Sequence, residues 1–301
     1  MVTRSDIQPA STDQLVRQPP HLARVAGAVV LYNTPPERFD RIASYLTQVE
    51  KLYVIDNSDQ PNTALIEQLS QHTSISYHSN GGNQGVAHAL NVAARLALRE
   101  TFDFLLTMDD DTTAPPGMIQ AMLTFLDTYE NRRQVGILSA AHRPYRQPKP
   151  SQRVLYTLTS GNLLNLNAWQ QVGPFQEELF IDHIDHEYGL RLNSHQFEVI
   201  ELPGIVLDHP LGELRRTKLF NLPYVSHHPI RNYYMVRNGI GVARQYFTRY
   251  PDFSQVVATL IAKEIVKVIF LEKSRLKRMK LISQGFIDAL RNRYGKYGGA
   301  R

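Results

Sequence analysis

Short apolar segments alternate with amphipathic helical segments along the first half of the chain. Apolar runs bounded by Gly, Pro, Asn, Asp or Ser are typical of buried strands, and apolar residues spaced by three or four positions are typical of helices that cover a sheet. The expected strands are residues 23–32, 51–59, 74–79, 104–109 and 134–140, and the expected helices are residues 35–46, 61–69, 86–98 and 118–129. This alternation predicts an α/β fold, with a mostly parallel sheet flanked by helices.

The pattern changes after about residue 215, where helical segments follow one another. We therefore expect a disordered leader at residues 1–21, one α/β domain at residues 22–215 and a helical C-terminal extension at residues 216–301. The leader has no apolar stretch that would make it a secretory signal, and no later segment is apolar for long enough to predict a spanning helix. The chain has no cysteine, which excludes disulfides and thiolate metal sites and fits a cytoplasmic location.

Positive charge is concentrated at the C-terminus. Residues 263–301 contain eleven Lys or Arg against three acidic residues, whereas the whole chain carries a net charge of +5. Residues 255–273 also carry an apolar stripe opposite Lys263 and Lys267. Such a segment could lie against the anionic inner face of the plasma membrane, close the catalytic domain, or form a homo-oligomer interface. Nucleic acid is not an expected partner, because the acidic clusters described next would repel phosphate backbones.

Three consecutive aspartates follow the fourth expected strand. In an open α/β sheet, ligands bind at the carboxyl ends of the strands, so these side chains should face a ligand site. Asp109 and Asp111 would lie on one side and Asp110 would point elsewhere if the backbone stays extended. Mg²⁺ prefers oxygen ligands and often takes only one or two carboxylates, with substrate phosphates completing its shell. The alternative is a solvated turn in which Asp111 caps the next helix.

A second acidic cluster lies in the segment FIDHIDHEYGLRL. If a helix begins near Ile184, Asp185 lies in its first turn, where the helix dipole keeps a carboxylate ionised and able to act as a general base. The alternative is a helix start whose acidic residues, such as Glu187, pair with Arg191. His209, in the segment VLDHP, is a candidate ligand for Mn²⁺, although a lone histidine is more often structural.

Taken in order, these motifs resemble the family 2 glycosyltransferases, which have the Rossmann-like GT-A fold, and most closely the bacterial rhamnosyltransferases. The resemblance covers roughly residues 24–240 and rests on the set of motifs in their order. The matching segments are AVVLYN, VIDNSD, GGNQGVAHALN, LLTMDDDT, SGNLL, FIDHIDHEYGLRL and HPIRNYYMVRN.

The resemblance implies a role for each motif. The donor nucleotide should be held by residues at the strand ends, namely Tyr32, Asn33, Asp56, Asn57, Asn83, Gly85, Asp109 and Asp110. Asp111 and His209 would bind Mg²⁺ or Mn²⁺. Asp185 would be the catalytic base, and Glu187 would help to position it or the acceptor. Arg231 and Arg237 would grip the donor phosphates or pack as helix residues, and the acceptor side would include Gly161, Asn162, Asp182 and Arg191.

The implied reaction is a single displacement that inverts the anomeric carbon and transfers a sugar to a glycan or lipid-linked saccharide in cell-surface polysaccharide synthesis. The favoured donor is dTDP-L-rhamnose. UDP-galactofuranose or another UDP-sugar is the alternative, because the usual rhamnosyltransferase motif has Gln and Ser where this chain has Asp110 and Thr112. A nucleotidyltransferase is less favoured, because no basic glycine-rich loop follows the first strand. A non-catalytic binding protein is also less favoured, because it would need no general base and the acidic cluster around Asp185 would have no function.

Overall fold

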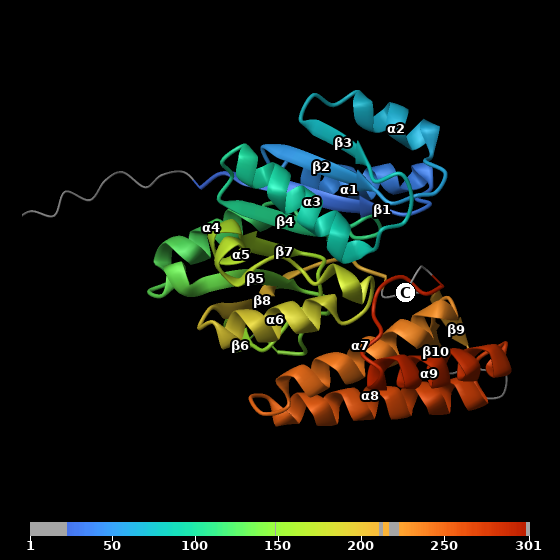
Figure 1. The fold of residues 1–301 in the computed structure, drawn as a ribbon. Helices are drawn as coiled ribbons and strands as arrows, with labels where there is room; N and C mark the ends of the chain where they lie inside the picture. Colours follow the sequence, from blue (N-terminus) through green and yellow to red (C-terminus); the bar gives the residue numbers. More distant parts are fainter. Residues whose placement is uncertain (1–22, 148, 211–212, 217–222, 299–301) are drawn as a thin grey trace, which may run out of the picture.

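The computed structural model describes residues 23–147, 149–210, 213–216 and 223–298. Within these residues, a central sheet has the strand order β3-β2-β1-β4-β7-β5-β8-β6 (Figure 1). The predicted mostly parallel α/β architecture is confirmed, since β3, β2, β1 and β4 are parallel neighbours and β5 runs parallel to β8. The strands are β1 (Val25–Leu31), β2 (Lys51–Asp56), β3 (Ile75–Ser79), β4 (Phe104–Asp109), β5 (Val135–Ala141), β6 (Gln152–Val154), β7 (Asn162–Asn165) and β8 (Glu198–Val206).

Side chains alternate between two hydrophobic cores, one on each face of the sheet. Ala26 and Ala28 of β1 belong to one core, whereas Val25 and Val29 of the same strand belong to the other. This period of two is the geometry of a strand that is covered on both sides. The covering helices are α1 (Phe39–Leu46), α2 (Thr63–Ser70), α3 (Val86–Arg99), α4 (Met118–Thr128), α5 (Leu166–Val172) and α6 (Ile184–Ser194).

The second half differs from the expected organisation in two places. The prolines and arginines of residues 141–153 predict a surface loop, but the last two of these residues enter β6, which pairs with β8. The hairpin of β9 (Glu213–Arg216) and β10 (Pro223–Ser226) crosses the predicted boundary at residue 215 and adds strands to a region predicted to be helical. The predicted leader, residues 1–21, lies outside the described residues.

Three C-terminal helices complete the molecule: α7 (Ile230–Tyr246), α8 (Pro251–Phe270) and α9 (Arg275–Leu290). In Figure 1 they form a layer beside the sheet, and α7 packs against both α8 and α9. Val236 and Val242 of α7 join the same hydrophobic core as Ala26 and Ala28 of the sheet. The extension is therefore continuous with the α/β core. None of the described helices is long and apolar enough to cross a membrane.

Candidate active site

The carboxyl ends of β1, β2 and β4 lie side by side. The strand register places Leu31 opposite Asp56 and Val30 opposite Asp109, so the loops that follow these strands share one edge of the sheet. The sequence predicted this arrangement, because parallel strands deliver their carboxyl ends to the same edge.

The middle one of the three consecutive aspartates points away from the other two. Asp109 is the last residue of β4, and its backbone N–H donates to Ser160 Oγ at 2.9 Å. Asp110 accepts a hydrogen bond from the hydroxyl of Thr34, in the loop after β1, as expected for a side chain that points away from its two neighbours. Thr34 is a site residue that the sequence analysis missed, although a hydroxyl in the loop after a strand end is a usable signal.

His209 reaches the aspartates through a short backbone bridge. Thr113 and Asp208 pair as an isolated antiparallel bridge, and their two N–H···O bonds are 2.9 and 3.2 Å long. The His209 Nε2 atom consequently lies 3.5 Å from Asp109 Oδ2 and 3.5 Å from Asp111 Oδ1. One ligand atom from each of these residues lies within 4.8 Å of the other two. Two carboxylate oxygens and an imidazole nitrogen suit Mn²⁺ or Mg²⁺, so the residues present fit the predicted cation.

The other nitrogen of His209 is fixed by a second histidine. His142 follows β5, and its Nδ1 atom lies 2.8 Å from His209 Nδ1. Burial lowers the pKa of His142 to about 4, so it is neutral at physiological pH. If the shared proton is on His209, its Nε2 presents a lone pair toward the two carboxylates, which is the state that a cation requires. His142 was missed in the sequence, although it lies directly after a strand end.

Desolvation and the neighbouring carboxylates both raise the pKa of Asp109. Desolvation raises the pKa of Asp109 to about 7, and the charges of Asp111, Asp110 and Asp185 add to the effect. The contribution of Asp185 shows that the two acidic clusters, far apart in sequence, face the same region. A divalent cation would offset the repulsion among the three neighbouring carboxylates and favour their ionised forms.

We expect Asp109→Asn to raise the melting temperature of the metal-free protein at pH 8. The pKa of Asp109 is raised in the folded state, so the folded protein binds more protons than the unfolded chain, and its stability falls as the pH rises from about 4 to about 7. Melting curves in EDTA at pH 5 and pH 8 test this, and the difference between variant and parent should shrink at pH 5. A variant that is less stable than the parent at pH 8 would contradict the repulsion.

The predicted nucleotide residues divide into buried and accessible groups. Asp56 is 1% exposed and accepts hydrogen bonds from the Ser58 N–H and the Tyr77 hydroxyl, both at 2.8 Å. Asn57 is 2% exposed and donates to the Gly85 carbonyl at 3.0 Å. These two residues shape the loops in this conformation. By contrast, Tyr32 is 51% exposed and available for contact, as is its exposed neighbour Asn33.

The loop at residues 81–85 needs its terminal glycine. Gly85 has φ +90°, and an added Cβ would lie 2.7 Å from the Phe180 carbonyl oxygen. Asn83 Oδ1 accepts from the Gly85 N–H at 3.0 Å, and the Asn83 carbonyl accepts from Lys296 Nζ at 3.0 Å. Lys296 thus brings a cation from the C-terminus to the predicted nucleotide loop. No sequence signal could have identified it.

Asp185 lies in the first turn of α6, as predicted, and follows a strained segment. Phe180, Asp182 and His183 all have positive φ angles, between 62° and 66°. Such conformations are costly for residues other than glycine and persist only where the surroundings enforce them. The Asp185 carboxylate is partly accessible, and one of its oxygens accepts from the His186 N–H at 2.9 Å.

The strained segment is held by two buried side chains of α7. Asn238 donates to the carbonyls of Leu179, Ile181 and Asp182 at 2.7–3.0 Å. Arg237 is fully buried and donates to the carbonyls of Glu178, Leu179 and Gly295. The prediction that Arg237 grips the donor phosphates is therefore not supported, because its guanidinium is committed inside the protein. The helix-packing alternative describes it better, and Asn238 was missed.

We expect Asn238→Ala to destabilise the protein by about 1–3 kcal/mol, because buried carbonyls lose their donors. Sugar transfer should fall further than stability alone explains, since the segment that presents Asp185 loosens. Denaturant unfolding combined with activity at a temperature where the variant is folded tests both effects. The matched control is Asn131→Ala, an exposed position where no change is expected. Equal stability of the two variants would contradict the inference that Asn238 holds the strained segment in place.

Glu187 and Arg191 form a buried pair away from the site edge. Glu187 is fully buried, accepts from the Tyr246 hydroxyl at 3.0 Å and lies 2.9 Å from Arg191. Arg191 also donates to the carbonyls of Val172 and Pro174. The predicted catalytic role of Glu187 and the predicted acceptor role of Arg191 are therefore not supported by this geometry. The alternative of an acidic residue pairing with Arg191 is what the structure shows.

Asp182 and Arg231 pair across the site. Arg231 Nε lies 3.2 Å from Asp182 Oδ1, and the side chain of Arg231 remains 40% exposed. The charge of Arg231 also acts on Asp109, where it lowers the pKa against the upward effect of burial. Arg231 is the member of the predicted arginine pair that can still reach a ligand.

Gly161 and Asn162 lie beneath the aspartate turn. Gly161 has φ +80°, and an added Cβ would lie 2.5 Å from Leu207, so only glycine fits here. Asn162 is 5% exposed and its side chain accepts from the Thr157 hydroxyl at 3.0 Å. Both residues support the turn. Because both are buried, the structure does not support their predicted contact with the acceptor.

A cavity of about 450 Å³ opens beside His142. It is lined by residues that include His142, Tyr145, Tyr156 and Glu201. Burial, and then the charge of Asp185, raise the pKa of Tyr156, so this cavity lies near both the histidine pair and the candidate base. Aromatic rings and a carboxylate in such a cavity suit a saccharide, whose rings have apolar faces and hydroxyl edges.

Comparisons with known proteins relate the chain to glycosyltransferases. Residues 29–176 match the family described as Glycosyl transferase family 2, a segment that contains β1 and the three aspartates. The chain is also similar to the dTDP-rhamnosyl transferase RfbF of Shigella flexneri. The alignment spans 300 residues at 23% identity and covers 93% of this chain and 98% of that protein. The α/β sheet, the aspartate turn at its carboxyl edge and these two similarities identify residues 29–176 as a family 2 glycosyltransferase domain with the GT-A fold.

Proposed function

We propose that this enzyme transfers L-rhamnose from dTDP-L-rhamnose to a hydroxyl of a saccharide acceptor in a metal-dependent, inverting reaction. The observation that carries the metal dependence is the Asp109, Asp111 and His209 group, whose ligand atoms converge. The similarity to a dTDP-rhamnosyl transferase along nearly the whole of both chains supports the donor.

Asp109, Asp111 and His209 would hold the cation, which would supply charge neutralisation at the diphosphate leaving group. Tyr32 and Asn33 would contact the nucleotide at the exposed end of β1. Arg231 and Lys296 would contribute positive charge to the phosphates, since both cations border the site and neither guanidinium nor amine is buried.

Asp185 would remove the proton from the acceptor hydroxyl. As that proton leaves, the acceptor oxygen attacks the anomeric carbon, the bond from this carbon to the diphosphate oxygen breaks, and dTDP departs. The acceptor would occupy the cavity lined by Tyr145 and Tyr156, which places its hydroxyl on the side of Asp185. Attack from the side opposite the leaving group inverts the configuration.

Thermal shift assays test the donor and the cation together. Ligands that bind only the folded protein raise its apparent melting temperature, so dTDP and dTDP-rhamnose should do so in the presence of Mn²⁺ or Mg²⁺ and much less in EDTA. UDP and UDP-galactofuranose serve as the comparison. A shift confined to the UDP compounds would assign the alternative donor class, and a shift of equal size in EDTA would contradict metal dependence.

A further inference from the structure

The outer surface of the C-terminal helices is apolar to an unusual extent. Between residues 253 and 270 of α8, the exposed side chains include Val256, Leu260, Val266, Ile269 and Phe270. Lys263 is the one exposed charged side chain among these residues. Phe270 is 68% exposed and Val266 is 55% exposed. A soluble helix normally turns a charged face to water. Val257, Ile261 and Val268 of the stripe predicted from sequence are buried, whereas Val256, Val266 and Phe270 are exposed apolar residues outside that stripe.

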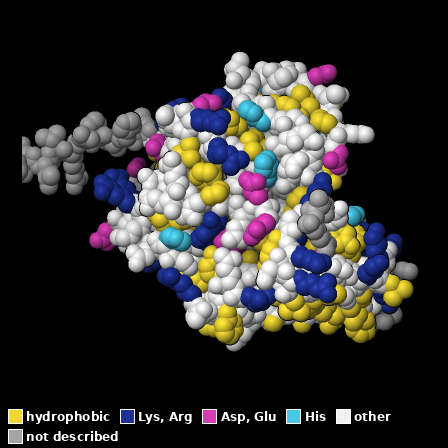
Figure 2. Space-filling model, in the orientation of Figure 1, with side chains coloured by type: hydrophobic (Ala, Val, Ile, Leu, Met, Phe, Trp, Pro, Cys, Tyr) yellow, Lys and Arg dark blue, Asp and Glu magenta, His cyan; other side chains and the backbone are white. Residues whose placement is uncertain are grey.

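Helix α9 extends this apolar surface. Leu276, Ile287 and Leu290 are exposed at positions that share one side of the helix, and Leu276 and Leu290 are 89% and 69% exposed. A groove of about 630 Å³ runs between α7 and α8, where Phe247, Ile261 and Ile265 line it, and Phe286 of α9 lies at its edge. Figure 2 shows hydrophobic side chains gathered along this part of the molecule, with Lys and Arg beside them. We call this surface the C-terminal apolar face.

Exposed cations outnumber exposed carboxylates around the C-terminal apolar face. Among the described residues from 240 to 298, ten Lys or Arg side chains are exposed, whereas Asp252 is the single exposed carboxylate. These cations include Lys263 on α8 and Lys273, Lys277 and Lys280 near the start of α9. The surface therefore combines exposed apolar side chains with a positive border.

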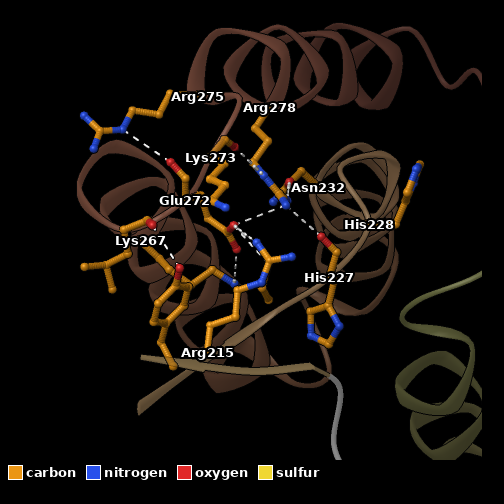
Figure 3. Close-up of polar contacts among 12 residues, drawn as sticks. Arg215, His227, His228, Asn232, Lys267, Glu272, Lys273, Arg275 and Arg278 are labelled. Carbon is orange, nitrogen blue, oxygen red and sulfur yellow. Dashed lines mark hydrogen bonds and ion pairs between the residues drawn. The ribbon is translucent and has the colours of Figure 1, made fainter. Parts of the chain in front are cut away.

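The other acidic residues of this region are engaged within the fold. Glu272 is 2% exposed; it accepts from the Ser226 hydroxyl at 2.9 Å and lies 3.2 Å from Arg278 (Figure 3). Glu264 pairs with Lys267 at 2.7 Å, and Asp288 accepts from the Tyr233 hydroxyl at 2.8 Å. Because these three carboxylates are used inside the fold, none of them neutralises the exposed cations.

We propose that the C-terminal apolar face docks on an anionic phospholipid bilayer, with the exposed side chains of α8 and α9 entering the headgroup region. Apolar residues and cations together match such a surface, because the former gain from leaving water and the latter from the lipid charge. A second copy of the chain is a poorer occupant, since a two-fold interface would bring two cationic borders together. Nucleic acid matches the charge but offers no apolar surface for Phe270 and Leu290.

Sedimentation of the full chain with vesicles tests this proposal. We expect binding to vesicles of phosphatidylcholine containing about a third phosphatidylglycerol, little binding to pure phosphatidylcholine, and weakening of binding by salt. Phe270→Asp combined with Leu290→Asp should abolish binding, and Lys273→Glu combined with Lys277→Glu should lower the partition coefficient at least about tenfold. Circular dichroism and melting temperature verify that both variants are folded.

The matched control is Arg132→Glu combined with Arg133→Glu, which reverses two exposed charges away from α8 and α9 and should bind like the parent. Absence of binding, or equal binding to both vesicle types, would overturn the proposal. So would a dimer in solution, measured by analytical ultracentrifugation, that Phe270→Asp and Leu290→Asp convert to a monomer. No nucleotide sugar is present in these experiments, so their result is independent of the proposed donor.

Discussion

Asp185→Asn is expected to lower sugar transfer by about 10²–10⁴-fold, the range associated with loss of a general base. The amide keeps the shape of the carboxylate at the start of α6, so the fold and nucleotide binding should persist. Initial rates with dTDP-rhamnose and a saccharide acceptor, measured beside the thermal shift by dTDP and Mn²⁺, separate the two properties. A turnover close to that of the parent would remove Asp185 from the mechanism.

Two further variants sharpen that experiment. Asp127→Asn changes the same functional group at an exposed position of α4 and should have no effect on either measurement. Glu187→Gln removes a buried charge that pairs with Arg191 and Tyr246. We expect it to lower the melting temperature, with a smaller loss of turnover than Asp185→Asn. A larger loss of turnover for Glu187→Gln, in a variant that stays folded, would return the catalytic role to Glu187.

Asp111→Asn is expected to remove the metal-dependent part of nucleotide binding. Asp111 supplies one of the two carboxylates that converge on His209 Nε2, and a neutral amide is a weaker ligand for a hard divalent cation. In the parent, dTDP at about 100 times its dissociation constant should stabilise the fold by about 2.7 kcal/mol when Mn²⁺ is present. In the variant, the shift should be the same with Mn²⁺ and with EDTA.

Asp208→Asn is the control for this substitution. Asp208 precedes His209 and its side chain is 75% exposed, so it is an acidic neighbour outside the converging group. Its backbone bridge to Thr113 does not depend on the carboxylate, and the position of His209 should be retained. If both variants lose the Mn²⁺-dependent shift equally, general negative charge rather than coordination would explain the metal response.

The sequence determined the sheet and the position of the site on it. Strand-like and helical periodicities identified β1 to β5 and the helices between them, because each period reflects which side chains must leave water. The position of Asp109 and Asp111 at a strand end then followed from the rule that parallel strands end together. The beginning of α6 near Ile184 was also predictable, and with it the place of Asp185 in the first helical turn.

Only the tertiary structure decided which polar residues are available for chemistry. Glu187 and Asp185 lie two positions apart in one acidic segment, yet α7 buries Glu187 and leaves Asp185 partly accessible. Arg231 and Arg237 form a similar pair, in which one guanidinium reaches the site and the other holds backbone carbonyls. Burial depends on what packs over a residue from far along the chain, and local sequence does not contain that information.

Long-range contacts also decided the composition of the site. His209 joins the aspartates through a two-residue bridge across 95 positions, His142 fixes its orientation, and Lys296 returns from the C-terminus to the loop at Asn83. The same is true of α8, whose apolar stripe was evident in sequence while the exposed share of it was not. Periodicity identifies the apolar residues of a helix, and only the packed molecule shows which of them remain exposed to solvent.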